Sequence, residues 1–421
     1  MNIPEKLRSL TTSLSARSEQ RKRLRGPADL SYAIADSIGM LDVGTWERLA
    51  APCGFFMSVD YLRALEDMLP ANLSSRYALI YSGTGAQREP VAAVYMQIAE
   101  VSLAQALPSK KESEAGRLQR SLDQLAHSAT QRILTCGNLL TFGQHGIAFA
   151  PDVDFQLVWH GIAEVLYRVR QAEKLVGKTH FVMIKDLHAP FTEHATNLEH
   201  LSYRYIETEP NMVLKLDQGW KHYDDYLASL ASKYRGTIRN SIFKVLDEAA
   251  CTVERISDLA PVQDQIHALY KAVQSNAGFR PFELSPEYFP ALQRVAGERF
   301  RCSVIKRDGA LLGFLISLAD GDTAVAYHIG FDREAAADLP LYLRLLHAGI
   351  VDAIDMGCKE VSYGRTALEP KAALGAKPQT FGILVRHRQP VLNKMMKRVL
   401  LGIEHEEAPA RSPFKKVKEA A

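Results

Sequence analysis

The stretch Cys302–Arg388 decides the fold, and it begins CSVIKRDGALLGFLISLADGDTAVAYHI. Three β-type runs, Cys302–Arg307, Ala310–Ala319 and Thr323–Ile329, are separated by two Asp-Gly pairs. Glycine accepts the positive φ that a two-residue hairpin turn needs, so Asp-Gly between such runs predicts hairpins. The stretch therefore opens with three antiparallel strands.

A different pattern follows Gly330. Apolar residues recur at helical spacing over Leu339–Met356, and Gly357 ends the run. The segment Glu360–Thr366 reads as a strand, residues 367–379 as a polar loop, and Thr380–His387 as a last strand. The predicted order is three strands, a helix, a strand, a polar loop and a strand.

Composition limits the function classes. The chain has 421 residues, which suits two domains of about 200 residues each. The net charge of +3 gives no case for DNA binding. No apolar run reaches the roughly 20 residues that cross a bilayer, so no transmembrane segment is expected.

Two further features indicate a cytoplasmic protein. The N-terminus is rich in Arg and Lys, and no apolar segment of the kind found in secretory signals follows it. The five cysteines show no C-x-x-C spacing, which argues against disulfides and zinc sites. The histidines show neither H-E-x-x-H nor H-x-x-E-H spacing, so no metal is expected.

The first half of the chain repeats the order of the second. Tyr77–Ala99 reads as strand, glycine turn and strand, like Arg301–Ala319. Phe155–Lys174 followed by Thr179–Asp186 reads as helix and strand, like Leu339–Thr366. One α/β unit used twice predicts two similar domains, and ligands often bind where such domains meet.

The second half resembles the GCN5-related N-acyltransferase (GNAT) fold, and more narrowly the BioF2-like, Fem-related acyltransferases. Tyr327–Asp332, the helix from Leu339, and Val361–Thr366 followed by Glu369, Lys371 and Gly375-Ala376 carry this resemblance. Tyr226–Leu230 with the basic residues after it is similar to the entry helix of the same group. Cys136-Gly-Asn138 and Lys185-Asp186 resemble the first half of its two-domain members, often labelled peptidoglycan-biosynthesis-like.

The resemblance implies an α+β fold with two tandem GNAT-like domains, each a mixed, mostly antiparallel sheet flanked by helices. We expect a disordered basic arm at 1–28, an N-terminal domain at 29–207, a C-terminal acyltransferase domain at 208–403 and a disordered tail at 404–421. The implied activity is transfer of an acyl group from acyl-CoA, as co-substrate, to an amine of a small molecule or cell-envelope precursor.

One departure keeps the donor open. GNAT enzymes usually bind the CoA pyrophosphate with backbone N–H groups of a glycine-rich loop after the fourth strand. Here that loop is Gly330–Pro340, with one glycine and three acidic residues that would repel a pyrophosphate. Aminoacyl-tRNA, the donor of Fem-type enzymes, remains an alternative, although no coiled-coil arm is visible in the sequence. A non-catalytic ligand-binding protein on a degenerate GNAT fold is the third reading.

The candidate site residues follow from acyl-transfer chemistry. The amine must be neutral, the carbonyl oxygen needs N–H donors, and the leaving group needs a proton. We expect Glu369 as base, Tyr342 as general acid, and His328 as a third catalytic candidate. Strand alternation predicts that Tyr327 and His328 point to opposite faces. The expected substrate-binding residues are Tyr327, Tyr363, Arg365, Lys371, Lys233, Arg235, Arg239, Asn138, His145 and Lys185.

Overall fold

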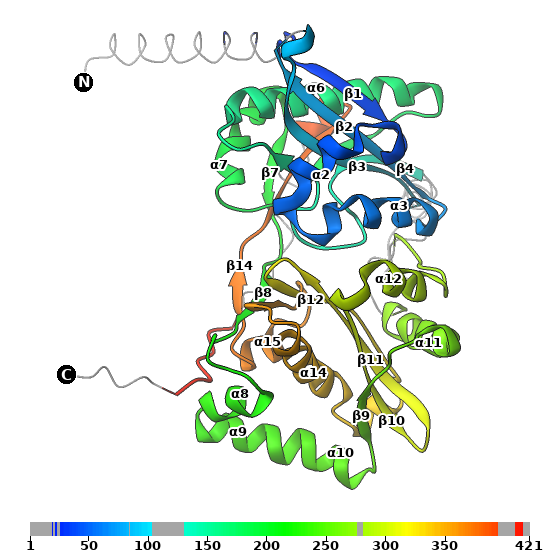
Figure 1. Cartoon of the computed structure of the whole chain (residues 1–421), viewed down its shortest axis with the longest axis vertical. Helices are drawn as coiled ribbons and strands as arrows, with labels where there is room; N and C mark the ends of the chain where they lie inside the picture. Colours follow the sequence, from blue (N-terminus) through cyan, green and yellow to red (C-terminus); the bar gives the residue numbers. More distant parts are fainter. Residues whose placement is uncertain are drawn as a thin grey trace, which may run out of the picture.

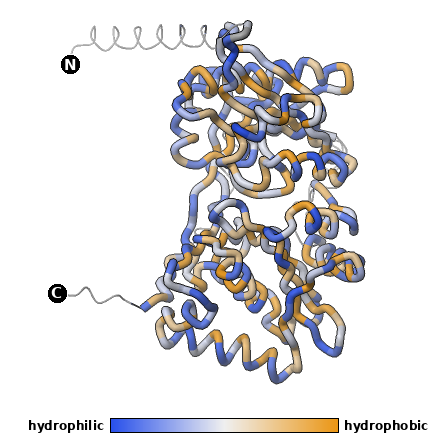
Figure 2. Tube along the Cα trace, viewed as in Figure 1, coloured by the Kyte–Doolittle hydropathy of each residue, from blue (hydrophilic) through white to orange (hydrophobic). Residues whose placement is uncertain are grey.

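The computed structural model describes residues 19, 22, 26–83, 85–102, 130–275, 281–394 and 409–415. They form two halves stacked along the long axis of the molecule, each built on one β-sheet (Figure 1). Apolar residues recur in short runs along the helices and strands of both halves (Figure 2), as expected for elements with one buried side.

The first half contains an eight-stranded sheet in the order β1-β2-β3-β4-β6-β15-β7, with β5 paired to β3. Every pair is antiparallel except β4 with β6, which are parallel. Its strands are β1 (Ser31–Ala35), β2 (Leu73–Ser82), β3 (Glu89–Ser102), β4 (Thr130–Cys136), β5 (Ile147–Phe149), β6 (Phe181–Leu187), β7 (Arg204–Glu207) and β15 (Gly382–His387). Its main helices are α2 (Val43–Ala50), α3 (Val59–Met68), α6 (Phe155–Ala172) and α7 (Phe191–Ala195).

The second half contains a seven-stranded sheet in the order β14-β8-β13-β12-β11-β10-β9. Its strands are β8 (Asn211–Lys215), β9 (Thr252–Arg255), β10 (Phe300–Arg307), β11 (Ala310–Asp320), β12 (Thr323–Phe331), β13 (Glu360–Ser362) and β14 (Lys377–Gln379). Its helices are α8 (Tyr223–Ser229), α9 (Ser232–Ile238), α10 (Lys244–Glu248), α11 (Gln263–Gln274), α12 (Tyr288–Ala296), α13 (Ala335–Asp338), α14 (Leu341–Asp355) and α15 (Leu368–Ala373). A π-helix, Arg239–Phe243, links α9 to α10.

Both hairpins of the deciding stretch form as predicted. Asp308 and Gly309 adopt positive φ values of 51° and 81°, and β10 pairs antiparallel with β11 around them. The helix between β12 and β13 is present as α14, and it packs on β10, β11 and β12. The predicted fold class, two tandem mixed sheets flanked by helices, is confirmed.

The last strand differs from its expected place. β15 lies within the range 208–403 expected for the C-terminal domain, yet it pairs with β6 and β7 of the first sheet. The chain thus crosses between the halves at β7–β8 and again at β14–β15 (Figure 1). The alternation of a strand predicts that it pairs, not which sheet it joins.

The tail also differs from expectation where it is described. Residues 409–415 lie on the second half, and Phe414 forms a β-bridge with Leu230 and contacts the rings of Trp220 and Tyr226. The expectation of disorder over 404–421 is therefore wrong for 409–415, because an aromatic ring gains apolar contacts there. The arm predicted for 1–28 lies almost wholly outside the described residues.

A continuous apolar core joins the two halves. It contains Trp46, Phe56 and Tyr61 from the first half and Tyr288 and Phe289 from the second, all fully buried. In the same region α3 packs against α12. Apolar contact of this kind fixes the relative position of two domains.

Candidate active site

The strands β12 and β13 separate close to the boundary between the halves. They pair in parallel only over Thr323–Val325 with Glu360–Ser362. Beyond Val325, β12 continues to Phe331 with no described strand beside it on the β13 side. We call this gap the β12–β13 opening.

A group of charged residues lies just past the end of β13. Arg365 Nη2 is ion-paired with Asp186 Oδ1, which stands at the end of β6 in the first half. Lys185 Nζ is ion-paired with Asp186 Oδ2 and donates to Thr141 O at 2.9 Å. Gly143 N also donates to Asp186 Oδ2, at 2.9 Å. We call Lys185, Asp186 and Arg365 the junction triad.

Within the junction triad, the buried carboxyl of Asp186 stays ionised. Burial opposes ionisation of Asp186, but the charges of Lys185 and Arg365 outweigh it, so the pKa of this carboxyl lies below its ordinary value. Burial lowers the pKa of Lys185, and Asp186 counteracts part of that effect. Arg365 Nε is buried and has no hydrogen-bond partner among the described residues.

Lys371 supports the loop that carries Arg365. Its side chain is buried, and Nζ donates to Gly364 O at 3.2 Å. Burial lowers the pKa of Lys371 to about 8. Gly364 has φ +77° and a Cβ there would meet the ring of Phe142, from the first half, at 3.2 Å. We therefore propose that Lys371 positions the loop, whereas the sequence suggested a direct hold on an anion.

Tyr342, at the start of α14, borders the opening. Its ring lies 6.0 Å from that of Phe331, at the end of β12. Tyr342 also lies close enough to Tyr363, just past β13, to contribute to the raised pKa of Tyr363. Burial raises the pKa of Tyr342 to about 12, so the phenol keeps its proton at neutral pH. No described residue hydrogen bonds to its hydroxyl.

Tyr327 and His328 face the same side of the sheet, so the prediction of opposite faces is wrong. A register shift pairs Ile316 with His328 and Ser317 with Ala326, which leaves Tyr327 as the extra residue of a β-bulge. Tyr327 Oη lies 2.6 Å from Tyr288 Oη. His328 contacts the rings of Tyr270 and Phe289, and its buried Nε2 has no hydrogen-bond partner among the described residues. Burial lowers the pKa of His328 to about 4.

Three further predicted residues are held by protein partners. Tyr363 Oη donates to Leu346 O at 2.9 Å. Asn138 Nδ2 donates to Tyr61 Oη at 2.8 Å. His145 Nε2 lies 3.2 Å from Phe142 O, and burial together with the charge of Lys185 lowers the pKa of His145 to about 4.

Glu369 and Lys371 do not face each other. Both lie on α15, where residues two apart point to different sides of the helix. Glu369 is exposed, and it accepts a hydrogen bond from Arg411 Nε at 2.8 Å. The sequence spacing suggested that Glu369 and Lys371 share one site. In the structure Lys371 is buried in the core, and Glu369 lies at the surface beside the tail.

Of the three predicted basic residues, Lys233 and Arg235 lie on α9, and Arg239 begins the π-helix that follows it. Lys233 and Arg239 are exposed, with no ion pair to a described residue. Arg235 Nη1 donates to Leu230 O at 3.2 Å. Their predicted role in substrate binding remains a prediction.

Sequence reasoning missed Asp320. Its Asp-Gly pair was interpreted only as a hairpin turn, but the side chain accepts a hydrogen bond from Phe55 N of the first half. Burial raises the pKa of Asp320 to about 6. His145 Nδ1 lies 3.8 Å from Asp320 Oδ2. No local signal marks a turn carboxylate that contacts a distant segment.

In the acidic loop after β12, the Asp332 carboxylate accepts hydrogen bonds from two backbone N–H groups of the same loop. Asp332 Oδ1 accepts from Glu334 N at 2.9 Å and from Ala335 N at 3.1 Å, at the start of α13. A pyrophosphate would need donors of this kind. The residues of this loop therefore do not fit a CoA pyrophosphate.

The described part of the chain contains neither a metal-binding cluster nor a membrane-spanning helix. No group of three or more His, Cys, Asp and Glu side chains there is placed to hold a metal ion. No helix in that part of the chain combines the length and apolar character needed to span a membrane.

The chain is similar to known proteins in sequence and in fold. Residues 232–372 match the family model described as acetyltransferase (GNAT) domain. The structure of FemX matches with a TM-score of 0.51 and 12% identity, covering 87% of this chain and all of that one. A tandem GNAT protein from the clavulanic acid biosynthesis pathway matches with a TM-score of 0.49 and 13% identity, covering 86% of this chain and 99% of that one. A search of curated proteins found no match.

The chain therefore shares the fold of the FemX structure over most of its length, and residues 232–372 of its second half match the model of the GNAT domain. The β12–β13 opening lies at the edge of this domain, where the first half meets it.

Proposed function

We propose that this protein is an N-acyltransferase that moves an acyl group from an activated donor to an amine at the β12–β13 opening. The observation that supports this most is the separation of β12 from β13 beside the junction triad. Backbone N–H groups of β12 that pair with no described strand would suit an acyl carbonyl, whose oxygen gains charge in the transition state. Tyr342 lies against Phe331 at the end of β12, and Arg365 follows β13 in the chain.

Each proposed residue has a distinct task. Arg365 binds a carboxylate or carbonyl oxygen of the substrate, and Asp186 with Lys185 fixes its position. Tyr342 donates a proton to the leaving group, as its retained phenol proton allows. The role of Glu369 as base stays a prediction from the sequence, because its carboxylate is exposed and bonded to Arg411 beside the tail. His328 is neutral near pH 7 and packed among rings, which favours a structural role.

Two classes of acyl donor fit the proposed reaction, acyl-CoA and aminoacyl-tRNA. Asp332 occupies the N–H groups that would hold a pyrophosphate, so an acyl-CoA must place its pyrophosphate outside this loop. The same observation favours a second candidate, transfer from aminoacyl-tRNA, whose acyl ester carries no pyrophosphate. Either donor delivers an acyl group to the same opening, and the acceptor is an amine in both cases.

Mass spectrometry of amines incubated with the protein tests the proposal. One series of reactions contains a panel of acyl-CoAs, and a second contains charged tRNA. We expect a mass increase equal to the acyl group in one series, lost when Arg365 is changed to Ala. No acylated product in either series, under conditions where the protein is folded, would contradict the proposal.

A further inference from the structure

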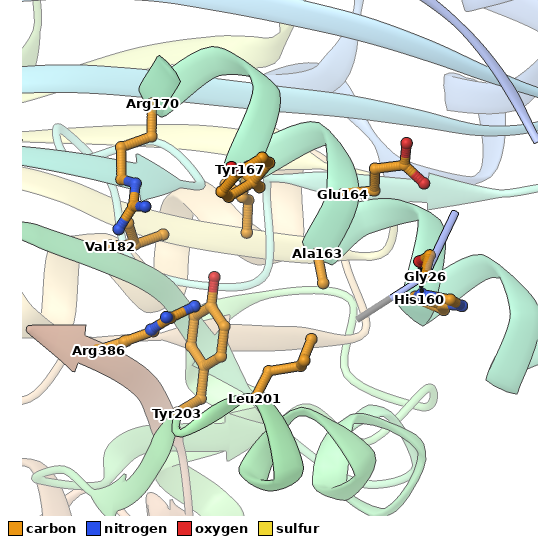
Figure 3. A pocket seen from close by; sticks show the side chains of 11 residues that line it. Gly26, His160, Ala163, Glu164, Tyr167, Arg170, Val182, Leu201, Tyr203 and Arg386 are labelled. Carbon is orange, nitrogen blue, oxygen red and sulfur yellow. Dashed lines mark hydrogen bonds between the residues drawn. The ribbon is translucent and has the colours of Figure 1, made fainter. Parts of the chain in front are cut away.

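A cavity of about 360 Å³ lies in the first half, beside α6 (Figure 3). Leu166, Leu201 and Val182 form part of its wall, and Tyr167 and Tyr203 add aromatic surface. The volume lies within the range of small-molecule sites. We call it the α6 cavity. It belongs to neither the β12–β13 opening nor the junction triad.

Two arginines reach this cavity from different elements. Arg170 comes from α6 and Arg386 from β15, and both guanidinium groups point toward the cavity (Figure 3). The guanidinium of Arg386 lies 6.0 Å from the centre of the Tyr203 ring. Among the described residues neither arginine has a carboxylate within ion-pairing distance. Burial, together with the charge of Arg386, lowers the pKa of Arg170.

A second hollow, of about 400 Å³, adjoins the cavity through Arg170. It is lined by Arg170, Lys174, Lys178, Thr179 and Arg388, and we call it the cationic groove. Thr179 is 5% exposed, and its Oγ1 is buried with no hydrogen-bond partner among the described residues. A buried hydroxyl without a partner carries a cost that a bound acceptor would remove.

Neighbouring acids do not account for these charges. Glu164 lines the far end of the cavity, but it accepts hydrogen bonds from Ala28 N, Tyr32 Oη and Arg168. The positive charges of Arg170 and Lys174 lie near the C-terminal end of α6, where they also interact favourably with the helix dipole. Arg386 lies on β15 and Arg388 directly follows that strand, so the helix dipole does not explain them. The cavity and the groove are thus lined by an unpartnered Thr179 hydroxyl and by five cationic side chains, none ion-paired with a described carboxylate: Arg170, Lys174, Lys178, Arg386 and Arg388.

We propose that the α6 cavity and the cationic groove together bind an organic phosphate ester. Its apolar or aromatic part lies against Tyr203 and Leu201, and its phosphate lies between Arg170, Arg386 and the Thr179 hydroxyl. Arginine forks bind phosphate oxygens in pairs, and an aromatic wall beside a guanidinium suits a flat or aliphatic group. This site is independent of the acyl-transfer chemistry.

Isothermal titration calorimetry of the full chain with phenyl phosphate tests the proposal. Phenol, which lacks the phosphate, and inorganic phosphate, which lacks the ring, are titrated in parallel. We expect saturable binding of phenyl phosphate, at least about tenfold tighter than inorganic phosphate, and none of phenol. Absence of saturable binding of phenyl phosphate at low ionic strength overturns the proposal.

Three variants locate the site. Arg170→Gln and Arg386→Gln should each weaken phenyl phosphate at least about tenfold, which corresponds to about 1.4 kcal/mol. Thr179→Val should weaken it several-fold and raise the melting temperature of the free protein, because it removes the unpartnered hydroxyl. Arg63→Gln, a change of an exposed arginine on α3, is the control and should leave binding unchanged. Unchanged binding in both Arg170→Gln and Arg386→Gln also overturns the proposal.

Vesicles distinguish a lipid from a soluble ester. Phosphatidylcholine vesicles that contain phosphatidic acid, a lipid phosphate monoester, are sedimented with the protein. Co-sedimentation that Arg386→Gln abolishes supports the proposal with a lipid as the ester. Binding of phenyl phosphate without co-sedimentation supports it with a soluble ester. Co-sedimentation that neither arginine variant reduces, without phenyl phosphate binding, contradicts it.

Discussion

Arg365 and Asp186 stand 179 residues apart in the chain, and their ion pair joins the two halves of the molecule. Asp186 is almost fully buried, with 1% of its side chain exposed, and 25% of the Arg365 side chain is exposed. Lys185 supplies the second positive charge. One carboxylate thus fixes both the loop after β13 and the end of β6.

Arg365→Ala should destabilise the protein by about 3 kcal/mol, because removing one partner leaves a buried charge less compensated. Lys185 and Gly143 N still contact Asp186, which keeps the loss at the lower end of the usual range. Urea unfolding at pH 7 measures the change, with Arg63→Ala as the control on an exposed arginine. A loss of stability no larger than that of the control would show that the pair does not hold the halves together.

His328→Phe should make stability less sensitive to acid. The folded-state pKa of His328, about 4, lies below the ordinary value of 6.5 because the ring is buried. The unfolded chain therefore binds the proton first, and stability falls as the pH drops from about 6.5 toward 4. Removing this histidine should flatten the slope by up to about 1.4 kcal/mol per pH unit.

Urea unfolding of wild type and His328→Phe at several pH values between 4.5 and 7.5 tests this slope. His145 and His347, also buried and with lowered pKa values, keep contributing in both proteins. An identical slope in the two proteins would contradict the burial argument. A large loss of turnover at pH 7 in this variant would instead support the catalytic role considered from the sequence.

Gly375→Ala should release the tail. Gly375 has φ +98°, and an added Cβ would meet the Phe414 ring at 2.4 Å. Gly357→Ala is the matched control, because Gly357 has φ +71° and nothing lies within 4 Å of its added Cβ. Hydrogen exchange of residues 409–415 should be faster in Gly375→Ala than in Gly357→Ala. Equal protection in both variants would mean that Phe414 is not held there.

Asp332→Ala should raise the affinity for CoA by about tenfold, because it frees two N–H groups and removes a repelling charge. Asp338→Ala is the control that removes a nearby charge without freeing those donors. Calorimetry with CoA separates the two effects. A gain in Asp338→Ala equal to that in Asp332→Ala, or none in either, would show that the Asp332 cap does not limit CoA binding.

Local patterns predicted the elements well and their partners poorly. The Asp-Gly turns and the helical spacing after Gly330 are encoded by neighbouring residues, so β10 to β12 and α14 appear as expected. The sheet that β15 joins depends on the arrangement of the whole chain. The same holds for Asp320, whose turn is local but whose hydrogen bond to Phe55 N is not.

The candidate site shows the same limit. Arg365 and Lys185 could be selected as charged residues beside strand ends, and the structure brings them together through Asp186. Alternation misplaced His328, because one extra residue in β12 shifts the register. Spacing alone grouped Glu369 with Lys371, although a helix points them to different sides.

The most direct test of the acyl-transfer proposal is the turnover number of Tyr342→Phe, measured with the donor and amine that the mass-spectrometric panel identifies. The change keeps the ring and removes only the hydroxyl at the β12–β13 opening, and Tyr81→Phe in the first half is the control. We predict a fall in kcat of about a hundredfold in Tyr342→Phe, the usual contribution of a general acid, with unchanged KM and unfolding midpoint, and no change in the control. Wild-type kcat in Tyr342→Phe would contradict the assignment of the active site to this opening.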